Sequence, residues 1–148
     1  MTKRELDEHL ELLQHLESER EMLAALETAA GPRMRHLDGM PHAHSVSDPV
    51  GYLAVEIADM RETITRREAA VARSEVVVEA YIQTIEDSLT RMIFRLRFIR
   101  GMVWKEVAAA IGGGNTEAGV KMACYRYIAR GGPARMGRPP KQKGMDEI

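Results

Sequence analysis

Three histidines, one cysteine and a glycine triplet are the residues of this chain that could most readily form a reactive or metal-binding site. His36, His42 and His44 include an H-x-H pair, but no cysteine or nearby carboxylate cluster completes a tetrahedral ligand set. Cys124 has no partner for an internal disulfide, and the glycines at 112–114 lack the Lys-Ser/Thr that follows a phosphate-binding loop. These patterns predict loop histidines, a buried cysteine, no enzymatic activity, and no metal or other cofactor.

The basic residues are concentrated in the C-terminal part of the chain. Residues 1–86 contain nine Lys and Arg against 17 Asp and Glu, a net charge of −8, whereas residues 87–148 contain 12 against 5, a net charge of +7. A local excess of this size suits contact with phosphates, because their neutralisation releases counterions and gives sequence-independent affinity. The alternative is a solvated basic surface without a partner.

The basic half contains three short apolar segments with the 3.6-residue spacing of helices that bury one face, each ended by glycine. Their expected buried residues are Leu89, Met92, Ile93, Leu96 and Ile99 in the first, Trp104, Val107, Ala108 and Ile111 in the second, and Val120, Ala123, Cys124, Tyr127 and Ile128 in the third. Gly101 is expected to have positive φ after the first helix. The order predicts a helix-turn-helix over residues 87–129, centred on Trp104, Ile111, Val120 and Ile128, with another small helical bundle as the alternative.

The second helix of a helix-turn-helix lies in the major groove of DNA. We therefore expect double-stranded DNA as the partner and residues 116–128 as the helix that reads it, with Asn115 or Thr116 as its N-cap. The candidate contacts are residues of the turn, the outward face of this helix and three later cations: Asn115, Thr116, Glu117, Ala118, Lys121, Met122, Tyr125, Arg126, Arg130, Arg138 and Lys141.

Residues 93–128, IFRLRFIRGMVWKEVAAAIGGGNTEAGVKMACYRYI, resemble region 4 of bacterial sigma factors. They are more closely similar to phage and prophage proteins that carry such a region behind a coiled-coil-like half, and residues 36–53, HLDGMPHAHSVSDPVGYL, resemble the connector of those proteins. The resemblance implies a phage-type transcription regulator without enzymatic activity. It also allows a module that binds RNA polymerase. A DNA-packaging recognition subunit is a third possibility. The chain departs from sigma factors at Glu117, Ala118, Lys121 and Met122, where Arg and Gln are common.

The acidic residues 1–86 are predicted to form two long helices for assembly, at about 4–29 and 49–85, joined by a connector at 30–48. The first has a leucine stripe and is expected to end at Gly31 and Pro32; the second is expected to begin with Asp48 as N-cap and Pro49 as its first residue. Leu6, Leu10, Leu13, Leu16, Leu23 and Leu26 form the leucine stripe.

Every seventh residue of the second long helix is β-branched, which is typical of a packed coiled-coil position. These residues are Val50, Ile57, Ile64, Val71, Val78 and Ile85. The second seam weakens at Arg67 and Ser74. A helix of this length needs another beside it, which a hairpin with residues 4–29, a homodimer through residues 49–85, or both could supply.

Residues 130–148 contain glycine, proline and a run of basic residues, and they predict a flexible basic tail. Gly137, Arg138 and Pro139 are similar to an AT-hook core, with a solvated tail as the alternative. Low aromatic content and abundant helix formers predict an all-α fold, with long N-terminal helices in a coiled coil or hairpin before the helix-turn-helix domain. No signal peptide or membrane span is apparent, so a cytoplasmic protein with no membrane partner is expected.

Overall fold

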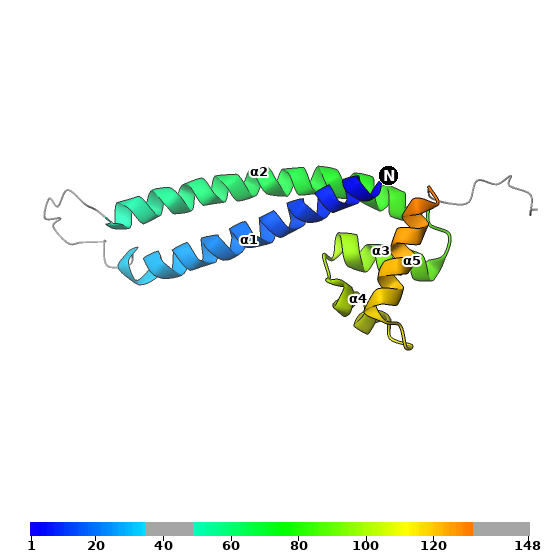
Figure 1. The fold of residues 1–148 in the computed structure, drawn as a ribbon. Coiled ribbons are helices and arrows are strands. Elements are labelled where there is room, and N and C mark those ends of the chain that lie inside the picture. The colour runs from blue at the N-terminus through cyan, green and yellow to red at the C-terminus, as the bar shows by residue number, and fades with distance from the viewer. Residues whose placement is uncertain (35–48, 132–148) are drawn as a thin grey trace, which may run out of the picture.

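The computed structural model describes residues 1–34 and 49–131, and every regular element among them is a helix (Figure 1). The elements in chain order are α1 (Lys3–Met34), α2 (Pro49–Gln83), α3 (Ser88–Phe94), the π-helical turn η1 (Arg95–Ile99), α4 (Trp104–Ile111) and α5 (Glu117–Ala129). The predicted all-α class is confirmed. Within the described ranges, no helix has the length and apolar character needed to cross a membrane.

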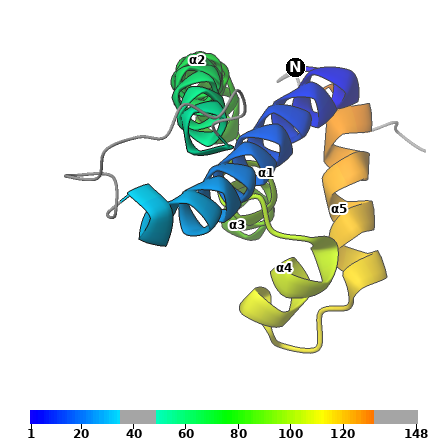
Figure 2. The same ribbon diagram turned by 90° about the vertical axis from the view of Figure 1, so that its left-hand side faces the viewer.

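The two long helices α1 and α2 form an antiparallel hairpin within one chain. The short helices gather at the end of the hairpin where α1 begins (Figures 1 and 2). Of the arrangements that the sequence left open, the structure contains the hairpin. The homodimer stays a prediction.

Helix α1 begins with a reciprocal cap that the sequence analysis did not identify. The Thr2 hydroxyl accepts from the amide of Glu5 at 3.3 Å, and the Glu5 carboxylate accepts from the amide of Thr2 at 2.6 Å. The predicted end of this helix at Gly31 and Pro32 is wrong, because α1 continues to Met34. Proline there removes only one hydrogen bond, from a terminal turn, so the helix can continue past it.

The β-branched stripe of α2 faces α1. Its members Ile57, Ile64, Val71 and Val78 are all 7% exposed or less, and Ile85, just beyond the end of α2, is also buried. The side chain of Val50, the first member of the predicted stripe, lies outside the described ones. Helix α2 begins at Pro49, as predicted, and its regular part ends at Gln83. The predicted cap Asp48 and the connector histidines His36, His42 and His44 lie outside the described residues.

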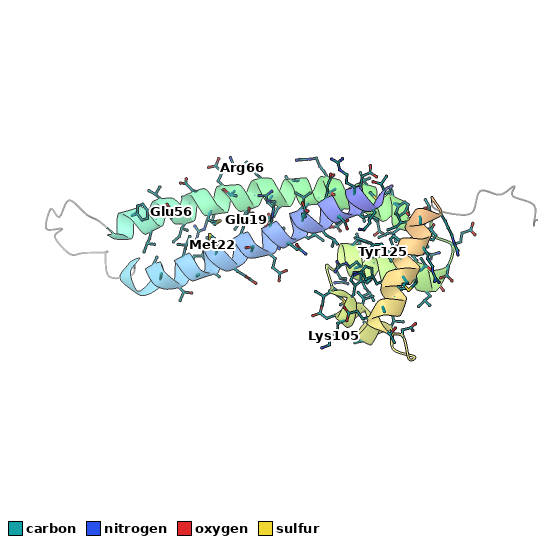
Figure 3. The ribbon with its side chains drawn as sticks, in the orientation of Figure 1. Glu19, Met22, Glu56, Arg66, Lys105 and Tyr125 are labelled. Carbon is teal, nitrogen blue, oxygen red and sulfur yellow. The ribbon has the colours of Figure 1, made fainter. Side chains whose placement is uncertain are left out.

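The polar interruptions of the second seam have partners on α1. Arg67 Nη2 donates to Glu19 Oε1 at 2.8 Å, and Glu19 lies between the two long helices in Figure 3. Seven residues further on, Ser74 Oγ lies 2.7 Å from His9 Nδ1. The two polar residues fit into the seam because each of them has a hydrogen-bonding partner on α1.

One hydrophobic core joins the hairpin to the short helices across the predicted boundary at residues 86 and 87. It contains Leu6 and Leu10 of α1, the end of α2, and buried residues of every later helix. The expected core residues Trp104 and Val120 are 7% and 2% exposed, whereas Ile111 and Ile128 are only partly buried at its edge.

The predicted buried face of residues 89–99 is partly wrong. Leu89 and Met92 are 45% and 51% exposed, while Phe94 and Phe98 are almost completely buried beside Ile93. The rings of Phe94 and Phe98 pack 5.5 Å apart between their centroids. Aromatic side chains bury more apolar area than Leu or Met, so the helix turns its phenylalanines inward.

Candidate nucleic-acid interface

Helix α4 is positioned by a tight exit from η1. Gly101 has φ +69°, as predicted, and the amide of Met102 donates to the carbonyl of Leu96 at 3.1 Å, which closes the helix end. Arg97 then fixes the following residues. Its Nη1 donates to the carbonyl of Met102 at 2.9 Å, and its guanidinium lies 4.7 Å from the ring centroid of Trp104. Arg97 of η1 therefore holds Trp104, the first residue of α4, in place through these two contacts.

The turn between α4 and α5 is built from glycines and two side-chain hydrogen bonds. Gly112 leaves α4 with φ +66°, and Asn115 Nδ2 donates back to its carbonyl at 2.8 Å. Thr116 has extended backbone geometry, and its hydroxyl accepts from the amide of Gly119 at 3.0 Å. Of the two predicted caps, Thr116 is thus the N-cap of α5, and Asn115 closes the turn before it.

The inner face of α5 packs on the core as predicted. Val120 and Cys124 are buried, and Ala123, Tyr127 and Ile128 pack against the core while partly buried. Burial raises the pKa of Cys124 to about 12, so this thiol stays protonated and acts as a small apolar side chain.

The outer face of α5 carries most of the predicted contact residues. Glu117, Ala118, Lys121, Met122, Arg126 and Arg130 are all exposed. Tyr125, which is labelled in Figure 3, departs from the prediction of a fully outward position. It is half-buried, and its ring lies 6.0 Å from that of Trp104 in an edge-on arrangement. Arg138 and Lys141 lie outside the described residues.

The cations of residues 87–131 divide into two groups. Arg91 donates to the carbonyl of Ile85, Arg95 Nη2 donates to Glu79 Oε1 at 2.6 Å, and Arg97 donates to the carbonyl of Met102. These three arginines therefore stabilise the fold. The other five are exposed and form no ion pair with the described residues: Arg100, Lys105, Lys121, Arg126 and Arg130. The last three of these lie on or directly after α5.

Two residues of α1 were missed by the sequence analysis. His9 is 1% exposed and donates from Nε2 to the carbonyl of Phe98 at 2.9 Å, so its Nδ1 accepts from the Ser74 hydroxyl. Its spacing of three from Leu6 and four from Leu13 placed it on the leucine stripe and could have indicated burial. Lys3, whose Nζ lies 5.0 Å from the ring centroid of Tyr125, had no comparable signal.

No cluster of three His, Cys, Asp or Glu side chains suited to a metal ion occurs in the part of the chain that the structure describes. Comparison of the chain with models of protein families, with characterised proteins and with solved structures finds no match.

Proposed function

We propose that the protein is a DNA-binding transcription regulator of phage or prophage type, in which α4 and α5 act as a helix-turn-helix. The observation that carries the proposal is the outward face of α5. It presents Lys121 and Arg126 to solvent, with Arg130 exposed directly after the helix, while Val120 and Cys124 fix the opposite face to the core. A rigid helix with an exposed, positively charged face has the character needed to enter a major groove.

The surrounding charge supports contact with the DNA backbone. Lysine and arginine supply phosphate contacts, which fix the position of a protein on duplex DNA without reading its sequence. Residues 87–131 contain five exposed cations that form neither an ion pair nor a side-chain hydrogen bond with the described residues, and three of them are on or next to α5. Base contacts would come from the first turns of α5, where Glu117, Ala118 and Met122 are exposed.

The proposal is tested by titrating a fluorescently labelled duplex of mixed sequence with the full chain at several salt concentrations. We expect binding that weakens as salt rises, since each phosphate contact releases counterions. Absence of binding at low salt would contradict the proposal. A repeat with RNA polymerase present distinguishes direct DNA binding from binding that depends on the polymerase.

A second candidate function is a module that binds a protein such as RNA polymerase. It is favoured by the exposed apolar side chains of α3. Leu89 and Met92 are about half exposed, and Met92 lines a groove with Leu96 and Ile99 beside α2. Under this alternative, Met92→Glu abolishes binding to the polymerase and leaves binding to DNA alone unchanged. If Met92→Glu instead loses DNA binding and still binds the polymerase, the groove does not bind the polymerase.

Self-association through residues 49–85 remains a further part of the proposal. The β-branched stripe is occupied by α1, so a partner subunit would contact the opposite face of α2, where Val76 and Val77 are 71% and 58% exposed. Val76→Glu should shift sedimentation from two subunits to one without unfolding the hairpin. A wild-type chain that sediments as one subunit at tens of micromolar would exclude this dimer.

A further inference from the structure

We propose that Lys3, in the first turn of α1, is part of the DNA-binding surface and contacts a backbone phosphate together with Lys121. This inference rests on the proposed function and extends it to the acidic half of the chain, where no contact residue was expected. Figures 1 and 2 both show the start of α1 beside the second half of α5. The hairpin would thus contribute directly to DNA binding.

Lys3 and Lys121 lie near the same aromatic ring, that of Tyr125. Lys3 Nζ lies 5.0 Å from the ring centroid of Tyr125, and Lys121 Nζ lies 6.0 Å from the same centroid. A tyrosine ring attracts cations within about 6 Å, so both ammonium groups lie beside Tyr125, separated by no more than the sum of these two distances. Two cations that share a ring repel each other, and an anion between them would relieve that repulsion.

The position of Lys3 is fixed by the fold. The cap formed by Thr2 and Glu5 sets where α1 begins, and Leu6, three residues after Lys3, has no exposed surface. His9, two turns into α1, ties the helix to the carbonyl of Phe98. The backbone of Lys3 therefore belongs to the same packed unit as α5, so its placement beside Tyr125 is a property of the core.

The Lys3 side chain also remains available to a ligand. Its ion pair with Asp7 is long, at 3.9 Å between Nζ and Oδ2, and both side chains are about half exposed. Exposed pairs of this kind contribute little and exchange readily with solvent or another anion. A DNA phosphate could replace Asp7 without moving the helix.

Arg4 provides a matched control on the same turn. Its side chain is 87% exposed and bonds to Glu8 at 2.8 Å along the outer side of α1, away from the buried Leu6. Lys3→Ala and Arg4→Ala remove the same formal charge from adjacent positions. A general electrostatic effect would lower the salt dependence of DNA binding alike in both variants, whereas a phosphate contact at Lys3 would lower it only in Lys3→Ala.

The test measures the salt dependence of duplex binding for full-length wild type, Lys3→Ala, Arg4→Ala and Lys121→Ala. We expect Lys3→Ala and Lys121→Ala each to lower the slope of log affinity against log salt by about one unit, with the slope of Arg4→Ala unchanged. If Lys121→Ala lowers the slope and Lys3→Ala does not, the inference is wrong and the proposed function stands. If wild type does not bind duplex DNA, both fail.

Discussion

Replacing His9 by leucine should destabilise the whole protein, because this imidazole joins α1, α2 and η1. Leucine can occupy the site but makes neither hydrogen bond. The carbonyl of Phe98 would then be buried without a donor, which costs about 1–3 kcal/mol, whereas half-buried Ser74 can turn toward water. We therefore expect the free energy of unfolding to fall by about 1–3 kcal/mol in His9→Leu.

Urea unfolding, followed by the fluorescence of Trp104 and by circular dichroism, measures this loss. His15→Leu is the matched control, since His15 is an exposed histidine on the same helix. Its free energy of unfolding should change by no more than about 0.5 kcal/mol. If His9→Leu unfolds at the same urea concentration as wild type, His9 does not hold the three elements together.

The same histidine should make stability depend on pH. Burial lowers the pKa of His9 below its ordinary 6.5, even though the Phe98 carbonyl and Glu75 act in the opposite direction. Below pH 6.5 the unfolded chain binds this proton more readily than the folded chain, so this contribution to stability is present above pH 6.5 and is lost as the pH falls. The difference in stability between wild type and His9→Leu should shrink between pH 7.5 and pH 5. If the two proteins differ in stability by the same amount at pH 7.5 and pH 5, His9 is not the source of this pH dependence.

Three further substitutions test the core and the helix ends by the same unfolding measurement. Trp104→Ala should lower stability by about 3–5 kcal/mol, since it removes a buried ring that contacts Arg97 and Tyr125; wild-type stability would show that Trp104 is exposed. Tyr81→Phe should raise stability by about 1 kcal/mol, because the Tyr81 hydroxyl is buried without a partner among the described residues; a loss instead would reveal a hydrogen bond there. Gly101→Ala should cost about 1–2 kcal/mol because φ is +69°, and an unchanged midpoint would indicate a relaxed turn.

The long helices could be predicted from sequence because their signals are local and repeat many times. The β-branched stripe from Ile57 to Val78 identified the buried side of α2 without reference to its partner. The partner itself could not be predicted, since Arg67 and Ser74 look like defects until Glu19 and His9 are placed opposite them. Spacing within one helix contains no information about which residues of another helix it meets.

The short helices were harder to predict because seven or eight residues leave two possible buried faces. Leu89 and Met92 fit the period as well as Phe94 and Phe98, and only tertiary packing decides between them. The glycine at 101, the Thr116 cap and the buried Cys124 followed from local rules and are confirmed. Lys3 reaches Tyr125 from more than 100 residues away in sequence, a contact that requires the folded core.

The central claim is that the outer face of α5 contacts duplex DNA, and the salt dependence of binding by charge variants tests it most directly. Lys121→Ala and Arg126→Ala remove exposed cations from α5, and Arg66→Ala removes a similarly exposed cation from α2, far from α5 in Figure 3. We predict that each α5 variant lowers the slope of log affinity against log salt by about one unit and that Arg66→Ala leaves this slope unchanged. Equal slopes in wild type and both α5 variants would contradict the account.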